Sequence, residues 1–157
     1  YNQRLIQKKD FTFLLCLLII DDTDNADYFL YKFNVSNETK KKILFFKGIY
    51  SNQIKKDIIS KKNLKKIFYY YGNSYLIDLI DFQLFKSRKD FKKLIKLKKY
   101  FENLKVPKFP IEAKTLMQKY KLKEGKDLGK KLKYLENLWV DNNFKISDKE
   151  VDRALSN

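Results

Sequence analysis

A turn near the C-terminal end of the chain combines glycine with lysine, two residue types that together suit a phosphate group. Gly125 and Gly129 lie one helical turn apart and leave the backbone uncovered at a predicted helix start. Unpaired N–H groups and the positive end of the helix dipole favour an anion at such a start. Mobile positive charge is added by Lys126, Lys130 and Lys131. The alternative is that Gly129 only allows two helices to pack closely.

A second group of lysines follows the spacing of a helix predicted over residues 88–105. Its polar face contains Lys89, Lys92, Lys93, Lys96 and Lys99, and its apolar face contains Phe91, Leu94, Ile95, Phe101 and Leu104. Like charges at these intervals repel one another, and a phosphate backbone would offset that repulsion. The same pattern occurs one element earlier at Lys61, Lys62, Lys65 and Lys66. A lysine face that is simply solvated is the alternative.

The distribution of charge favours a nucleic acid as the partner. The formal net charge is +16. Residues 1–40 hold five basic and six acidic side chains, whereas residues 41–105 hold eighteen and five. A lysine-rich composition alone would not leave the first quarter of the chain neutral, so a basic surface beyond residue 40 is indicated.

Several kinds of site are excluded by residue type. The chain has no histidine and a single cysteine, Cys16, which argues against a zinc or haem site and against a disulfide. The apolar run 11–20 is too short to cross a bilayer and reads as a core helix, so we expect a cytoplasmic protein without a membrane partner. No nucleophile with an adjacent base and no phosphate-binding loop motif is present, and we predict no catalytic and no metal-binding residue.

Two pairs of aspartates have a spacing that could serve chemistry. Asp22 and Asp24 form a D-x-D pair of the kind that holds magnesium in phosphoryl transfer, but helix capping is the better interpretation because no glycine-rich helix start precedes them. Asp78 and Asp81 lie three residues apart, opposite the apolar stripe of their helix. We expect them on a solvated face or in ion pairs with nearby lysines rather than in acid–base chemistry.

These side chains would be positioned by helices alone. Apolar spacing and capping residues predict helices over 2–20, 25–33, 37–50, 52–59, 61–71, 75–86, 88–105, 111–120 and 126–142, and a last helix that begins with the capping box Ser147–Glu150. Gly72 is predicted to end one helix. Pro107 and Pro110 exclude helix from the segment around them. We therefore predict an all-α fold of about nine to ten helices without a sheet, divided into a body (residues 1–105), a linker (106–110) and a tail (111–157).

The motifs of the tail resemble the C-terminal end of bacterial CCA-adding tRNA nucleotidyltransferases, relatives of poly(A) polymerases. The shared order is Phe109-Pro110, Leu116-Met117, the turn Glu124 to Gly129, Leu132, Leu135-Glu136, Trp139 and Phe144. The body adds Phe33 to Glu38, Tyr70 to Asn73, and Leu79-Ile80-Asp81. The chain departs from the family where Ala113 and Thr115 replace a Gly and an Asp.

This resemblance implies the body and tail of a longer enzyme. The chain begins at Tyr1 without a methionine, and we expect it to be a piece of a larger protein. In the family, an N-terminal head binds magnesium, CTP and ATP and adds CMP and AMP to the tRNA 3′ end. The catalytic head is not matched here. The role implied for this chain is to anchor the tRNA elbow, with no cofactor of its own.

The contact candidates for tRNA follow from the lysine patterns. They are Gly125, Lys126, Gly129, Lys130 and Lys131 in the tail, and Lys61, Lys65, Lys92, Lys93 and Lys96 in the body. Two other functions remain open. The chain could be a freestanding helical nucleic-acid-binding module, or a structural bundle that binds a protein and has no enzymatic role. Binding of tRNA predicts one continuous basic face, whereas a structural bundle predicts scattered lysines.

Overall fold

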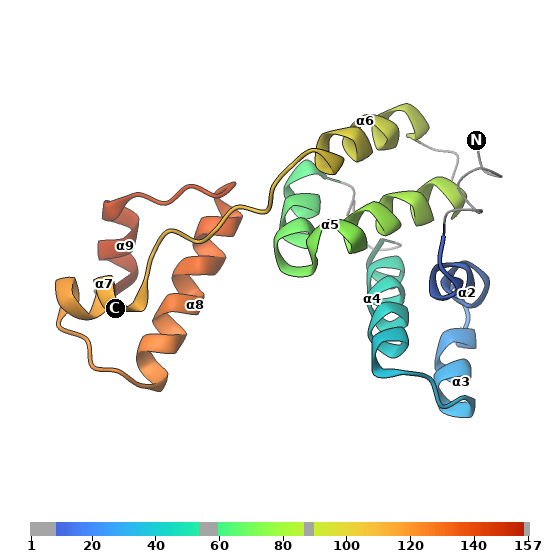
Figure 1. Cartoon of the computed structure of the whole chain (residues 1–157), viewed down its shortest axis with the longest axis horizontal. Helices are drawn as coiled ribbons and strands as arrows, with labels where there is room; N and C mark the ends of the chain where they lie inside the picture. The colour runs from blue at the N-terminus through green and yellow to red at the C-terminus, as the bar shows by residue number, and fades with distance from the viewer. Residues whose placement is uncertain (1–8, 54–59, 87–89, 156–157) are drawn as a thin grey trace.

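The computed structural model describes residues 9–53, 60–86 and 90–155 (Figure 1). Over these residues the chain is all-helical and contains no strand, which confirms the predicted fold class. The described residues contain eight helices, where nine to ten were predicted for the whole chain. Their bounds are α2 Phe11–Ile19, α3 Asn25–Lys32, α4 Asn37–Gln53, α5 Lys61–Lys86, α6 Phe91–Glu102, α7 Ala113–Tyr120, α8 Lys126–Asp141 and α9 Asp148–Leu155.

The helices α2 to α6 surround one hydrophobic core in the body. Its largest fully buried members include Phe13, Phe46, Phe68, Phe82 and Phe101. Phe13 and Phe46 meet edge to face at 81°, which suits the quadrupole of the aromatic ring, whereas Phe68 and Phe101 are tilted by 47°. This core holds α5 in the middle of the body, with α6 lying along it (Figure 1).

A glycine divides α5 into the two helices that the sequence predicts. Gly72 has φ 82° and ψ 178°, and the residues on either side are helical. A side chain at this position would disfavour such a backbone conformation. The halves 61–71 and 73–86 therefore point in different directions. The first half begins at Ser60, whose hydroxyl accepts a hydrogen bond of 3.2 Å from the N–H of Asn63, as expected of an N-cap.

The helix predicted over 2–20 is interrupted at Asp10 and is less buried than predicted, and its residues 2–8 lie outside the described part of the chain. The predicted helix 2–20 is wrong at Asp10, which has an extended backbone and caps α2 by accepting a hydrogen bond of 2.7 Å from the N–H of Phe13. The expectation that α2 is buried all round is also wrong, because Phe11 and Leu18 are 76% and 79% exposed. The turn before α3 is ordered by Asp21 and Thr23, and the side chain of Asp24 makes no capping hydrogen bond.

Two further helix boundaries differ from the prediction. Ser51 lies inside α4 and does not begin a new helix, and the predicted helix 52–59 falls mostly outside the described residues. The predicted helix 88–105 is realised as α6, which spans only Phe91–Glu102. Asp90, with φ 58°, and Asn103 bound it, while Lys89 lies outside the described residues.

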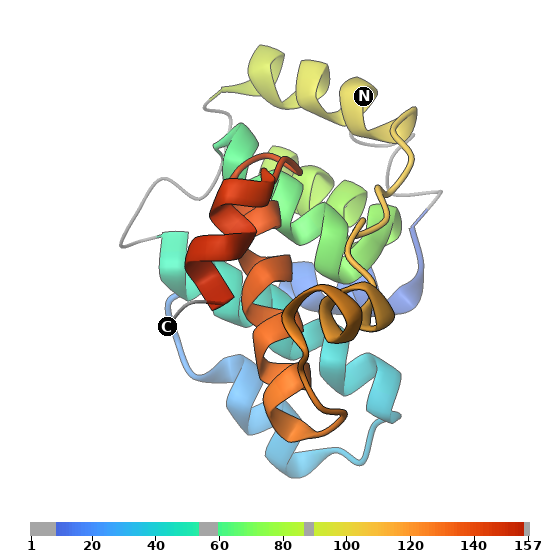
Figure 2. The same cartoon turned by 90° about the vertical axis from the view of Figure 1, so that its left-hand side faces the viewer.

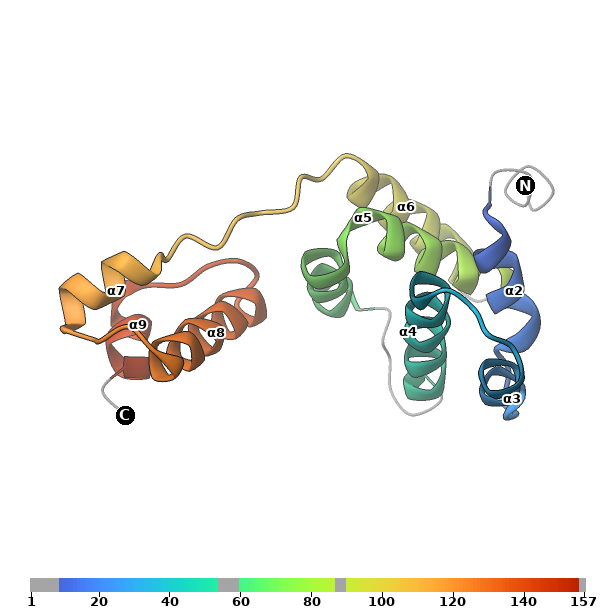
Figure 3. The same ribbon diagram turned by 60° about the horizontal axis from the view of Figure 1, so that its bottom comes forward.

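The tail consists of α7, α8 and α9 around a small core of its own. Leu116, Leu128, Leu135 and Val151 are its buried members. The capping box before α9 forms as predicted, since the N–H of Ser147 donates to Glu150 Oε2 at 2.8 Å and the N–H of Glu150 donates to Ser147 Oγ at 3.4 Å. Figure 2 views the molecule from the side of the tail. Residues 104–112 contain no helix and run between α6 and α7 (Figure 3).

Candidate nucleic-acid interface

The helix α6 is fixed on the body by an apolar face and one lysine that points inward. Leu94 and Phe101 are buried, and the Phe101 ring lies 5.5 Å from that of Phe68. Lys98 reaches inward to Asp81, and its ammonium lies 2.7 Å and 2.9 Å from the two carboxylate oxygens. These contacts determine which residues of α6 face the solvent.

The outward face of α6 is a row of lysines. Lys92, Lys93, Lys96 and Lys99 are all exposed, as their spacing predicts. Among the described residues, none of the four ammonium groups has a carboxylate within 4.0 Å. Four like charges without an acidic partner on three turns of helix repel one another. This α6 lysine row is the strongest candidate for a surface that binds phosphates.

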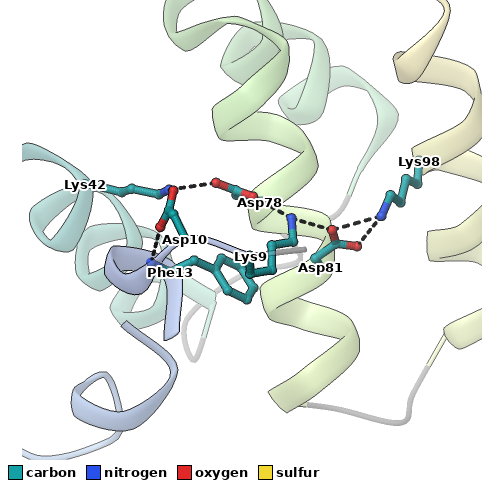
Figure 4. A network of polar contacts seen from close by, with 7 residues as sticks. All are labelled: Lys9, Asp10, Phe13, Lys42, Asp78, Asp81 and Lys98. Carbon is teal, nitrogen blue, oxygen red and sulfur yellow. Dashed lines mark hydrogen bonds and ion pairs between the residues drawn. The ribbon is translucent and has the colours of Figure 1, made fainter. Parts of the chain in front are cut away.

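Beneath α6, Asp78 and Asp81 lie in a buried ion-pair network rather than on a solvated face (Figure 4). Asp81 is fully buried, and its carboxylate also forms an ion pair of 2.7 Å with the ammonium of Lys9. Asp78 joins Lys9 at 2.6 Å and Lys42 at 2.8 Å. The alternative of ion pairs with lysines is thus confirmed and that of a solvated face is wrong. The partners come from the residues before α2, from α4 and from α6, so the network ties these elements to α5.

The charges of this network stabilise one another. Burial disfavours the ammonium of Lys9, but hydrogen bonds to Asp78 and Asp81 outweigh it and raise the pKa of Lys9. The same balance, with Asp10 and Asp78 as partners, raises the pKa of Lys42. Burial disfavours the carboxylate of Asp10. The hydrogen bonds from Lys42 and from the N–H of Phe13 outweigh this effect and lower the pKa of Asp10. These shifts favour the charged forms of Lys9, Lys42 and Asp10 at neutral pH, and the network acts as a structural support for α6.

The lysines at the start of α5 lie between α6 and the tail. The ammonium of Lys61 sits 4.3 Å from the ring centroid of Tyr100 on α6. Lys65 donates a hydrogen bond of 3.1 Å to Asn143, and Lys66 forms an ion pair with Asp141. Lys65 was predicted to contact phosphate, but its ammonium is directed to the loop after α8. Lys61 lies nearer the α6 lysine row.

An aromatic cluster joins the first half of α5 to α8. The Tyr69 ring lies 5.3 Å from the Trp139 ring, which in turn lies 5.0 Å from Phe144 and 5.5 Å from Phe109. The Tyr69 hydroxyl donates to Glu136 at 2.5 Å. Phe109, Trp139 and Phe144 belong to the motifs that resemble those of nucleotidyltransferases. Here their side chains pack against one another. We call this contact the body–tail junction.

The tail turn presents a looser arrangement of its candidate residues. Gly125 has φ 154°, a conformation that favours glycine, and α8 begins without a side-chain cap. Lys126 and Lys130 are exposed, although Lys130 lies 3.7 Å from Asp127. The acidic Asp127 already compensates the helix dipole at this end. Lys131 is half-buried and donates to the carbonyl of Leu155 at 3.4 Å.

The alternative explanation for Gly129 is wrong. A Cβ atom built at this position meets nothing within 4 Å, so the glycine does not serve close packing of helices. A pocket of about 350 Å³ lies beside the turn and is lined by residues that include Lys123, Lys126 and Lys131. The turn remains a candidate phosphate site.

The candidate residues fall into two groups that lie apart. In Figure 1, α6, the start of α5 and the loop after α8 lie along the upper side of the molecule, and α8 begins at its lower end. A helix of 16 residues is about 24 Å long. Lys126 and Lys130 are therefore separated from the α6 lysine row by roughly the length of α8. The structure also places Lys62 and Lys145 in the lining of one pocket, although they lie 83 positions apart in the sequence and no spacing rule could pair them.

Comparison with known protein families, with curated proteins and with solved structures finds no match for this chain. In the described part of the chain, no three His, Cys, Asp or Glu side chains are grouped so that they could hold a metal ion. None of the helices described there combines the length and the apolar character needed to cross a membrane.

The body–tail junction makes the stability of the protein sensitive to alkaline pH. Burial, with the hydrogen bond to Glu136, raises the pKa of Tyr69 from 10.0 to about 12. Below pH 10 the phenol of Tyr69 is neutral in both the folded and the unfolded protein. Above pH 10 the unfolded chain loses this proton before the folded protein does, which favours unfolding. We expect the free energy of unfolding to fall as pH rises from about 10 to about 12, and to fall less in Tyr69→Phe. Urea unfolding at pH 9 and pH 11 measures this, and equal pH dependence in the two proteins would contradict it.

Proposed function

We propose that this chain is the tRNA-binding body and tail of a CCA-adding tRNA nucleotidyltransferase of the poly(A) polymerase family. It anchors the tRNA elbow in the cytoplasm while a head elsewhere in the longer enzyme, with magnesium, CTP and ATP, extends the 3′ end. The observation that carries the binding role is the α6 lysine row, four exposed lysines with no carboxylate within 4.0 Å among the described residues. They lie on a helix that buried side chains and the ion pair of Lys98 with Asp81 hold on the body. The enzymatic context rests on the resemblance of the motifs.

The mode of binding follows from the chemistry of the row. Lysines that extend from one helix face contact phosphates rather than base edges, and such contacts fix position without reading sequence. Double-stranded RNA is recognised mostly by shape and by its backbone. The α6 lysine row suits the stacked, A-form part of a folded RNA, with Lys61 at its end near Tyr100. The tail turn, at the other end of α8, would contact a separate part of the same molecule.

We expect replacement of the α6 lysine row by glutamine, in the variant Lys92→Gln/Lys93→Gln/Lys96→Gln/Lys99→Gln, to weaken tRNA binding at least tenfold at low salt. The plot of log affinity against log salt should become shallower by about three to four, because each phosphate contact contributes about 0.9 to the slope on a duplex. Fluorescence anisotropy with labelled tRNA at several salt concentrations measures both quantities.

The matched control replaces four exposed lysines elsewhere on the surface. Lys40→Gln/Lys41→Gln/Lys133→Gln/Lys149→Gln changes the net charge by the same amount and should alter the slope by less than about one. Equal losses in the two variants would show that only net charge matters and would favour a structural bundle. Competition by single-stranded RNA or duplex DNA as strong as that by tRNA would favour a freestanding nucleic-acid-binding module.

A further inference from the structure

A polar pocket of about 610 Å³ lies where the body meets the tail. The body contributes Lys62, from the first turn of α5. The tail contributes the loop between α8 and α9, through Asp141, Asn142, Asn143, Lys145, Ile146, Ser147 and Glu150. One ligand in this pocket would therefore contact both parts of the chain.

The acidic groups of the pocket are already bound within the protein. Asp141 pairs with Lys66. The Glu150 carboxylate accepts hydrogen bonds of 2.8 Å from Asn142 and of 2.8 Å and 2.7 Å from the N–H and hydroxyl of Ser147. By contrast, the ammonium groups of Lys62 and Lys145 have no carboxylate within 4.0 Å among the described residues. Lys62, Lys145 and Lys66 thus outnumber Asp141 and Glu150 by one positive charge, and the ammonium groups of Lys62 and Lys145 are available to an anionic ligand.

The loop that carries Lys145 is held in place before any ligand binds. Asn143 and Phe144 both have left-handed backbones, with φ 56° and 64°, which is unusual for a bulky aromatic residue. Packing maintains this conformation, because the Phe144 ring lies 5.0 Å from Trp139 and its N–H donates to the Trp139 carbonyl at 2.8 Å. Backbone strain that the surroundings maintain often marks a functional position.

The pocket continues the α6 lysine row. Lys61 lies over Tyr100 of α6, and Lys62 is the next residue along α5. Lys65, one turn later, contacts Asn143 of the loop. Lys61, Lys62 and Lys65 thus place positive side chains between α6 and the loop after α8, and these elements lie along the upper side of Figure 1.

We propose that this pocket binds one phosphate of the RNA backbone, held jointly by Lys62 of the body and Lys145 of the tail. The inference rests on the proposed RNA-binding function and deepens it by giving the body–tail junction a ligand of its own. A ligand shared by two segments binds best when they are docked, so RNA shifts the protein toward the docked arrangement.

The test measures tRNA affinity against salt for Lys62→Gln, Lys145→Gln and the double variant. Because one phosphate is shared, each single variant should lose most of what the double variant loses, and the salt slope should become shallower by about one. A three- to tenfold loss is expected for the double variant at low salt. Lys40→Gln/Lys114→Gln, one exposed lysine from each part, is the matched control and should lose less than twofold. Unchanged circular dichroism melting verifies that all variants fold.

The outcomes separate this inference from the proposed function. If the α6 variant loses affinity and Lys62→Gln/Lys145→Gln behaves as its control, the pocket is not a phosphate site and the RNA-binding function stands. Additive losses in the two single variants would also overturn a shared phosphate. If neither the α6 variant nor the pocket variant loses affinity, both proposals fail. As a second readout, tRNA should change the emission of Trp139, the single tryptophan, in the wild type and not in the double variant.

Discussion

The variant Asp81→Ala is expected to lose about 3–5 kcal/mol of unfolding free energy, because removing one partner from a buried ion pair leaves the other charge without compensation. Asp81 is fully buried and holds Lys98 of α6 at 2.7 Å and Lys9 at 2.7 Å. The side chains of both lysines are almost entirely enclosed, at 13% and 11% exposed. Urea unfolding followed by circular dichroism at neutral pH measures the loss.

The control for this prediction is an ion pair at the surface. Asp27 pairs with Lys47, and both side chains are substantially exposed, so Asp27→Ala should cost less than about 1 kcal/mol. If Asp81→Ala costs no more than Asp27→Ala, the lysines find solvent easily and the network does not support α6. If it costs the expected amount, the orientation of the α6 lysine row depends on a carboxylate that never touches RNA.

The second large effect is expected at the body–tail junction. Trp139 is 3% exposed and lies among Tyr69, Phe109 and Phe144. Replacing a buried aromatic residue by alanine costs about 3–5 kcal/mol. We expect Trp139→Ala to destabilise the tail by an amount in this range and to speed its proteolysis well before that of the body. Limited trypsin digestion, with fragments identified by mass spectrometry, follows both parts in one experiment.

Tyr134 provides the matched control on the same helix. Its side chain is 53% exposed and lies on α8 five residues before Trp139. Surface substitutions generally cost less than about 0.5 kcal/mol. Tyr134→Ala should therefore change the rate of tail cleavage by less than about twofold relative to the wild type. Equally fast cleavage of body and tail in Trp139→Ala would contradict the prediction, because it would mean that the two parts unfold as one unit.

Local signals in the sequence were sufficient for the helices. Gly72 ends a helix because its backbone is left-handed, and Ser60 and Ser147 cap helices because their hydroxyls reach N–H groups three residues on. Each of these features involves neighbours within one turn, so spacing alone reveals it. The exposed lysines of α6 were predicted for the same reason, since one apolar stripe fixes which face remains outside.

Features that depend on distant partners were not predictable in this way. The burial of Asp78 and Asp81 requires Lys9, 69 positions before Asp78, and Lys98 on a separate helix. Lys65 and Lys92 look alike in the sequence, but Lys65 lies opposite Asn143 and Lys92 opposite solvent. Gly129 looked suited to helix packing, and only the folded chain shows that nothing approaches it.

The backbone conformation of Gly72 affects the distance between α6 and the far end of α8. The half of α5 before it carries the side chains that hold the tail, and the half after it carries the aspartates that hold α6. Because α8 is about 24 Å long, a change of about 10° in the angle between these halves would move its far end by about 4 Å. The span between the two groups of lysines therefore depends on the backbone angle at Gly72, together with the contacts of α6 with Phe68 and Lys61.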